Sequence, residues 1–159
     1  NGEPALIRIK VNNLEEPDMI HLLNKAGRAG VTIHLIVRSI CCMVAGVTGE
    51  SENIVIKRIV DRYLEHSRIL IFGTSEDAVV IIGSADLMTR NLLQRIEVMV
   101  RIKSEKYRDE LIDYFDIQWS DNDKAVYLLP GYKQEKVQNN TSVKCNAQES
   151  IYNYLAGKK

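Results

Sequence analysis

Apolar side chains near the start of the chain follow two patterns that together predict a βαβ unit. Residues 5–11 alternate apolar with basic side chains, as in a half-buried strand, so Lys10 should emerge near its end. Residues 31–40 are almost continuously apolar and often β-branched, which is typical of a strand covered on both faces inside a parallel sheet. Between them, Pro17 opens a helix with apolar residues at helical spacing, and Gly30 ends it. A strand, a helix and a second strand make such a unit.

The middle of the chain predicts a loop, a helix and then a hairpin. Residues 41–52 have little periodicity and contain two glycines, so we expect a loop there. Apolar residues then recur three and four apart, which predicts an amphipathic helix over residues 53–65. Residues 68–72 and 78–82 are short β-rich runs separated by five residues, which indicates an antiparallel hairpin.

Pairing within this hairpin would bring three polar side chains together. If Phe72 faces Ala78, the same register extended past the ladder places His66 opposite Ser84. Opposed residues share a face of a sheet, as do residues two apart in one strand. We therefore expect His66, Arg68 and Ser84 to cluster at one end of the hairpin.

The last third of the chain predicts two further strands and two helices. Residues 95–102 alternate as a strand, a helix packed on the sheet follows, and residues 124–129 have the pattern of an edge strand. Residues 133–148 are polar and lack a period, so we expect a mobile connection between the main body, residues 1–132, and a C-terminal helix of the same domain within residues 149–159. The predicted fold is α/β, with a mixed, mostly parallel sheet flanked by helices.

Composition and charge are those of an ordinary globular domain. The 159 residues suit one domain, and 45% are hydrophobic while 26% are charged. No apolar run approaches the ~20 residues of a membrane span, and no signal peptide opens the chain. A net charge of zero argues against a general nucleic-acid binder, which needs a surplus of Lys and Arg.

The cysteines and the first residues bear on the origin of the chain. Cys41 and Cys42 are adjacent and a third cysteine stands far from them, which makes neither a disulfide framework nor a C-x-x-C zinc pattern. We expect buried, small apolar residues in a reducing cytosol. The chain starts without methionine and runs at once into a strand, which suggests an excised piece of a longer protein.

The predicted cluster of an imidazole, a guanidinium and a hydroxyl group indicates a phosphate site. His66 can act as nucleophile or proton donor, Arg68 as a permanent bidentate cation, and Ser84 beside Gly83 as a small hydrogen-bond donor. Arg38 stands at the end of a presumed parallel strand, where α/β sheets expose functional groups. Arg38 is therefore a further candidate for phosphate binding, with a salt bridge to a nearby carboxylate as the structural alternative.

These residues stand in the order of a known motif. The second half of the phospholipase D-type motif, H-x-K followed by G-S-x-N, Arg and Glu, resembles His66-x-Arg68, Gly83-Ser84-x-Asp86, Arg90 and Glu97. The chain departs from the motif in two ways. Arg68 and Asp86 replace the usual Lys and Asn, and Gly73 stands where an Asp is expected after H-x-K.

Five ordered motifs carry a closer resemblance, to the C-terminal domain of bacterial polyphosphate kinase. It extends from about Ala5 to Val126, with a weaker echo in residues 151–154, and it implies a phospholipase D-like fold. The five motifs are Lys10-x-Asn12-Asn13-Leu14, Val37-Arg38-Ser39-Ile40-Cys41-Cys42, Ser51-Glu52-Asn53-Ile54, Glu65-His66-Ser67-Arg68 and Ser84-Ala85-Asp86-x-Met88-x-Arg90-Asn91.

This resemblance implies reversible transfer of the terminal phosphate of ATP to polyphosphate through a phosphohistidine. The phosphorylated histidine would lie in a domain that is missing here, so the chain alone should be inactive and should work with the remaining domains of the enzyme. The implied partners are ATP or ADP, polyphosphate and further copies of the enzyme in a homo-oligomer, with Mg²⁺ as cofactor. The implied location is the cytoplasm, where peripheral association with the membrane is compatible with the resemblance. No acidic pair has the spacing of a magnesium site, although Asp86 and Glu97 are candidates.

The resemblance also assigns roles to single residues. Arg38 and His66 would contact nucleotide phosphate, with His66 as the second, catalytic histidine. Ser84, Arg90 and Lys10 would be further phosphate contacts. Each has a scaffold alternative: Ser84 in a turn, Arg90 as a tether of its loop, and Lys10 as an exposed strand lysine.

Two other functions stay open on the sequence. A phospholipase D-like phosphodiesterase, such as a nuclease, would pair the H-x-R motifs of two copies across a twofold axis. A noncatalytic domain would bind phosphate through its arginines and use its other faces for assembly. Hydrolysis of a diester by a homodimer would favour the first, whereas full activity after Arg38→Ala or His66→Ala, with phosphate still bound by the chain, would favour the second.

Overall fold

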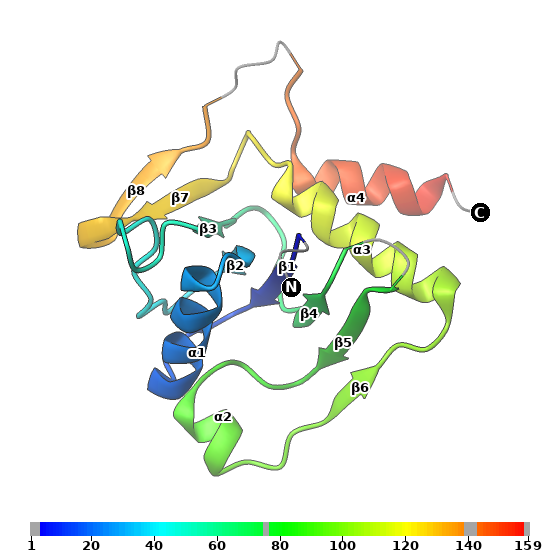
Figure 1. The fold of residues 1–159 in the computed structure, drawn as a ribbon. Helices are drawn as coiled ribbons and strands as arrows, with labels where there is room; N and C mark the ends of the chain where they lie inside the picture. The colour runs from blue at the N-terminus through cyan, green and yellow to red at the C-terminus, as the bar shows by residue number, and fades with distance from the viewer. Residues whose placement is uncertain (1–3, 75–76, 139–142, 158–159) are drawn as a thin grey trace.

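The computed structural model describes residues 4–74, 77–138 and 143–157, whose strands form one eight-stranded sheet (Figure 1). The strand order is β6-β5-β4-β1-β2-β3-β7-β8. The strands are β1 (Leu6–Val11), β2 (Thr32–Val37), β3 (Ile54–Arg58), β4 (Ile69–Phe72), β5 (Val79–Gly83), β6 (Met99–Arg101), β7 (Val126–Leu129) and β8 (Lys133–Lys136). The helices are α1 (Pro17–Arg28), α2 (Thr89–Leu93), α3 (Glu105–Trp119) and α4 (Ala147–Ala156).

The sheet is mixed but mostly antiparallel, so the prediction of a mostly parallel sheet is wrong. Among the strands of the described residues, β1 with β2 and β2 with β3 pair in parallel, whereas the other five neighbouring pairs are antiparallel. Parallel neighbours need a crossover connection, and the predicted βαβ unit, which is confirmed, supplies one through α1. Few residues separate β4 from β5 and β7 from β8 along the chain. Such short connections can join antiparallel strands but not parallel ones, and both pairs are antiparallel.

Alternate residues of the central strands pack into two cores, one on each face of the sheet. Ile9 and Ile33 belong to a buried cluster with Leu23 of α1. Ile71 belongs to a second cluster with Phe115 of α3. Figure 1 shows α1 and α3 well apart, with the central strands between them. Because both faces of the central strands are covered, only the ends of these strands are open for a site.

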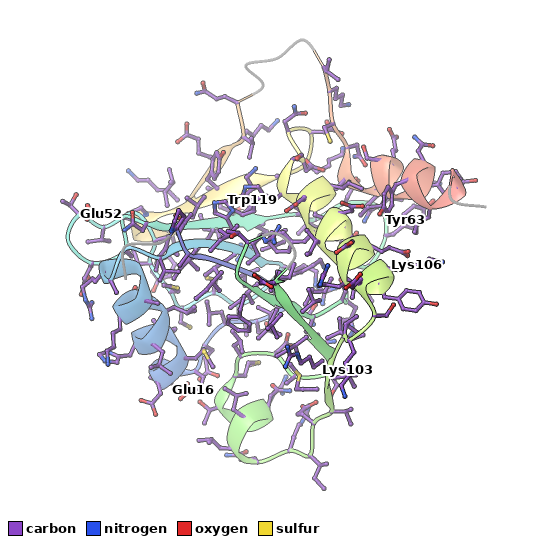
Figure 2. The ribbon with its side chains drawn as sticks, turned by 45° about the vertical axis from the view of Figure 1, so that its right-hand side comes forward. Glu16, Glu52, Tyr63, Lys103, Lys106 and Trp119 are labelled. Carbon is purple, nitrogen blue, oxygen red and sulfur yellow. The ribbon has the colours of Figure 1, made fainter. Side chains whose placement is uncertain are left out.

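Trp119, at the end of α3, packs against His34 of β2. The Trp119 side chain, which is labelled in Figure 2, stacks on the imidazole of His34. The ring centroids are 4.2 Å apart and the interplanar angle is 13°. Burial, and then the positive charge of nearby Arg8, lowers the pKa of the imidazole. His34 is therefore a packing residue between sheet and helix.

The helix predicted over residues 53–65 is absent, and β3 with an irregular segment takes its place. Ile54 pairs with Ile33 of β2, and the chain after Arg58 runs without regular structure to β4. Val60 and Leu64, which the helical stripe would bury, are 64% and 76% exposed. The apolar β-branched residues at the start of this stretch satisfy a strand as well as a helix, and the open edge of β2 decides for the strand.

The predicted hairpin of β4 and β5 is confirmed, but its register differs by one residue. Phe72 pairs with Val79 instead of Ala78, because one more residue belongs to the loop. His66 therefore does not stand opposite Ser84. A shift of one residue reverses the facing of every side chain, so the predicted cluster cannot rest on this ladder.

The C-terminal part differs from expectation at three places. The predicted strand over residues 95–102 shortens to β6, and β7 is not the edge of the sheet because β8 pairs with it. β8 begins the stretch that was expected to be an unpacked connection, in which residues 139–142 lie outside the described part of the chain. The terminal helix is confirmed and begins earlier, at Ala147.

Cys42 is exposed and Cys41 and Cys145 are only half-buried, so the prediction of buried cysteines is wrong. No helix within the described ranges is both long and apolar enough to cross a bilayer.

Candidate phosphate site

The candidate site is a pocket of about 470 Å³ at the ends of the central strands. It lies where β1 and β2 end, where β4 begins and where the chain leaves β5 toward α2. Ligands of α/β sheets bind beyond the carboxyl ends of parallel strands, which is the situation here. The lining residues are Asn12, Asn13, Arg38, His66, Arg68, Ser84, Asp86, Arg90, Asn91, Arg95 and Glu97. We call this the anion pocket.

The anion pocket gathers most of the residues singled out from the sequence. Arg38, His66, Arg68, Ser84 and Arg90 all line it. Their clustering survives the shifted hairpin register because the pocket is built from strand ends and loops, not from one face of the hairpin ladder. Arg95, Asn12 and Asn13 also line it but were missed as site residues, although Asn12 and Asn13 stand in a recognised motif and Arg95 is two residues from Glu97.

Asp86 ties three parts of the pocket together. Its Oδ1 accepts hydrogen bonds from the backbone N–H groups of Asn12 (2.8 Å) and Asn13 (3.3 Å) and from Nε of Arg68 (3.2 Å). Its Oδ2 accepts from Nδ2 of Asn13 (2.9 Å) and from a terminal nitrogen of Arg68 (3.2 Å). Burial opposes ionisation, but these hydrogen bonds outweigh it, so the pKa of Asp86 lies below its ordinary value.

The guanidinium group of Arg68 is largely occupied by hydrogen bonds to two residues of the pocket, Asp86 and His66. Nε and one terminal nitrogen hold Asp86, while the other terminal nitrogen donates to His66 Nδ1 at 2.9 Å and to the His66 carbonyl oxygen at 3.0 Å. A guanidinium fork can serve two partners at once, which the single ammonium of the usual Lys does less readily. Arg68 and Asp86, which replace the usual Lys and Asn of the motif, therefore form a salt bridge with each other.

The contact from Arg68 determines the proton position on His66. A guanidinium can only donate, so Nδ1 must accept and the neutral imidazole carries its hydrogen on Nε2. The positive charge of Arg68 is the largest cause that lowers the pKa of His66, and Arg38 adds to it. At neutral pH the exposed His66 thus presents an Nε2–H donor to the pocket.

Ser84 belongs to a second hydrogen-bond network, around Glu97. Ser84 Oγ donates to Glu97 Oε2 and accepts from the Val98 N–H at 3.1 Å, while Asn91 Nδ2 donates to Glu97 Oε1 at 2.6 Å. These hydrogen bonds lower the pKa of Glu97. Gly83 allows β6 to approach, since an added Cβ would lie 2.5 Å from the Val98 carbonyl oxygen. Ser84 therefore holds the loop before β6 in place.

Three guanidinium groups remain for a ligand. Within the described ranges, no salt bridge includes Arg38, Arg90 or Arg95. The alternative of a salt bridge from Arg38 to Asp86 or Glu97 is not formed, and Glu97 is held by neighbours other than Arg90. Guanidinium groups without an ion pair are well suited to phosphate oxygens.

Lys10 does not line the anion pocket. It is 2% exposed and pairs with Glu65 at 3.3 Å, so the expectation that it emerges at the strand end is wrong. Burial lowers the pKa of Lys10, and the Glu65 carboxylate partly offsets this effect. Glu65 also accepts from Tyr114 Oη (3.4 Å) and from Gln148 Nε2 (3.0 Å). Lys10 thus anchors the segment just before His66 against the centre of the sheet.

The acidic residues of the pocket do not fit a magnesium site. Asp86 and Glu97, the two candidates, have their carboxylate oxygens engaged by the donors described above. In the part of the chain that the structure describes, no three His, Cys, Asp or Glu side chains are grouped so as to hold a metal ion.

Sequence comparisons connect this geometry to one family. The chain matches the family described as polyphosphate kinase C-terminal domain 2 over residues 1–148. The polyphosphate kinase of Vibrio cholerae is 41% identical over 154 residues, which are 97% of this chain and 22% of that protein. The polyphosphate kinase of Staphylococcus saprophyticus is 41% identical over 142 residues, which are 89% of this chain and 20% of that protein. The chain thus spans about a fifth of the length of these relatives.

Structural comparisons agree. The crystal structure of polyphosphate kinase from Porphyromonas gingivalis matches 99% of this chain and 24% of that chain, with a TM-score of 0.95 and 41% identity. A phospholipase D family member, Nuc from Salmonella typhimurium, matches 74% of this chain and 80% of that chain with a TM-score of 0.56 and 16% identity, which shows a phospholipase D-like fold. The resemblance noted in the sequence is confirmed, and the chain belongs to the polyphosphate kinase family as its C-terminal domain 2.

Proposed function

We propose that this chain forms the phosphate-binding half of an active site that reversibly transfers the terminal phosphate of ATP to polyphosphate. The observation that carries the proposal is the placement of His66 and Arg38 in one pocket with two further guanidinium groups, Arg90 and Arg95. The remainder of a polyphosphate kinase, about four-fifths of the length of the relatives, would supply the rest of the site, including the phosphorylated histidine.

The proton position on His66 supports different roles for two histidines, one as a hydrogen-bond donor and the other as the nucleophile that is phosphorylated. A histidine that attacks phosphorus with Nε2 needs a free electron pair there, whereas Nε2 of His66 carries hydrogen. His66 would therefore donate a hydrogen bond to the transferring phosphoryl group, and a histidine outside this chain would be phosphorylated. The same geometry argues against a phospholipase D-like phosphodiesterase in which His66 is the nucleophile.

Arg38 would neutralise phosphate oxygens during transfer. Phosphoryl transfer spreads negative charge over the oxygens of the moving group, and fixed cations lower the barrier by stabilising that charge. Arg38 directly follows the buried end of β2, which fixes its backbone, and it lines the pocket. Arg68 would act indirectly, by orienting His66.

The test uses the full-length enzyme with single substitutions. His66→Ala should lower kcat by about 10²–10³-fold, the usual effect of losing one donor to transition-state charge. His21→Ala, in an exposed position on α1, is the matched control and should leave turnover unchanged. Near-normal turnover of His66→Ala would remove its catalytic role.

A second experiment tests whether the chain needs the rest of the enzyme for activity. The 159-residue chain alone should make no polyphosphate from ATP. Robust synthesis by this chain would contradict the proposal. Hydrolysis of a phosphodiester by the chain without any nucleotide would instead support the phosphodiesterase.

A further inference from the structure

His66 stands in a segment of the chain that has no regular structure. Residues 60–67, which we call the His66 segment, lie between β3 and β4 and form neither helix nor strand. Among the described residues, no backbone group of this segment forms a hydrogen bond with another backbone group. Val60, Tyr63 and Leu64 are exposed, so apolar packing does not fix this part of the segment either. The position of His66 therefore depends on side chains that reach the segment from elsewhere in the fold.

Gln148 of α4 binds this segment through three hydrogen bonds. The backbone N–H of Tyr63, which is labelled in Figure 2, donates to Gln148 Oε1 at 3.0 Å. Gln148 Nε2 donates in return to the Tyr63 carbonyl oxygen at 2.9 Å and to Glu65 Oε1 at 3.0 Å. One carboxamide thus pairs with both the donor and the acceptor of a single backbone residue, as a neighbouring strand would. The last of these contacts lies one residue before His66.

α4 is a fixed support for Gln148, because other contacts attach its first turn to the rest of the domain. Ala147 is buried in the core cluster that contains Phe115 of α3. Its backbone N–H donates to Oδ2 of the buried Asp121 at 2.7 Å. Asn146 is the N-cap of the helix. The attachment of α4 therefore does not depend on Gln148, whose hydrogen bonds instead hold the His66 segment.

Two further contacts hold the same segment, but only through its side chains. Asn146 Nδ2 donates to Asp61 Oδ2 at 2.7 Å, near the start of the segment. Lys10 pairs with Glu65 at 3.3 Å, near its end. Gln148 differs from both because it also binds the backbone of Tyr63. The course of the backbone sets the direction in which the next side chains leave the chain.

The placement of His66 matters because its proposed role depends on geometry. A donor that stabilises a transferring group acts over about 2.7–3.1 Å, and a misplacement of about 1 Å can cost about 10²-fold in rate. We propose that Gln148 is a positioning residue, which holds residues 63–65 so that the Nε2–H group of His66 reaches the transferring phosphoryl group. Gln148 does not line the anion pocket, so it acts on that group only through His66. This inference rests on the proposed function.

The test is a double-mutant cycle on the turnover of the full-length enzyme, with Gln148→Met and His66→Ala. Methionine keeps the length and helix propensity of glutamine but has no amide. Gln148→Met should lower kcat by about tenfold or more and leave KM for ATP within about twofold, because the guanidinium groups of the pocket still bind phosphate. In the His66→Ala enzyme, the same substitution should change kcat by less than about twofold. Asn153→Met, at an exposed position of α4, is the matched control and should leave kcat unchanged in both backgrounds.

Hydrogen exchange of the wild-type full-length enzyme, resolved to single amides by mass spectrometry, gives a measurement that needs no variant. The Tyr63 N–H is bonded to Gln148, whereas its neighbour Leu64 is exposed. Relative to the rates in an unstructured peptide, the Tyr63 amide should exchange about tenfold more slowly than the Leu64 amide. This measurement decides the question alone if Gln148→Met does not fold.

Each other result has a definite meaning. A normal kcat of Gln148→Met, or an equal loss of kcat from this substitution with and without His66, overturns the role of Gln148 while the proposed function stands. A rise in KM for ATP without a fall in kcat also overturns it, because Gln148 would then act on substrate binding. Equal protection of the Tyr63 and Leu64 amides overturns the hydrogen-bonded contact itself. Near-normal turnover of His66→Ala overturns the proposed role of His66, and this inference with it.

Discussion

Replacing Asp86 with Asn should destabilise the chain strongly, although the change removes only a charge and exchanges an oxygen for an NH₂ group. The Asp86 and Arg68 side chains are 6% and 13% exposed, so water cannot replace the lost interaction. One carboxamide oxygen can still accept from the backbone of Asn12, but the new NH₂ group faces donors and leaves them without an acceptor. Removing one partner of a buried ion pair costs about 3–5 kcal/mol, and we expect a value in this range.

Urea unfolding followed by the fluorescence of Trp119, the single tryptophan, measures this cost. Asp109→Asn is the matched control, since Asp109 pairs with Arg108 at 3.0 Å but its side chain is 62% exposed. Pairs at the surface contribute about 0–1 kcal/mol. A loss for Asp86→Asn as small as that of Asp109→Asn would refute the reasoning.

The pH dependence of the same measurement gives a second check. The folded state lowers the pKa of Asp86 below its ordinary value of 3.8, so its contribution is complete above that value and is lost as the pH falls through the folded-state pKa. The difference in stability between wild type and Asp86→Asn should therefore shrink below pH 3.8. A difference that stays constant through this acid range would show that the carboxylate charge is not the cause.

Three further predictions concern other parts of the site. Nitrogen NMR should find the Nε2–H form of His66 with a pKa below the ordinary 6.5, and Arg68→Gln should raise that pKa; an Nδ1–H form would contradict the assignment. Gly83→Ala should cost about 1–3 kcal/mol in urea unfolding because its Cβ meets the backbone of β6, whereas Gly157→Ala, with ordinary contacts, should cost little. Lys10→Met should cost about 3–5 kcal/mol by leaving a buried carboxylate unpaired, and a loss below about 1 kcal/mol would show that the pair is dispensable.

Several elements follow from the sequence alone because their signals are local. Pro17 and the apolar spacing after it specify α1, and the alternation in residues 5–11 specifies β1. The order of the motifs around Arg38 and His66 identifies the family without any coordinates. These signals depend on neighbours within a few turns of chain, so distant contacts do not change them.

Only the tertiary structure decides the features that depend on which segments meet. Residues 54–58 form a strand because β2 offers an edge, although their apolar spacing also fits a helix. Lys10 is buried because Glu65, 55 positions later in the chain, reaches it, and no local pattern shows that pairing. Arg68 and Asp86 pair across the end of the β4–β5 hairpin, and this contact selects the proton position on His66. Periodicity reports which side of an element is apolar, but charge pairing and proton position depend on distances that folding alone sets.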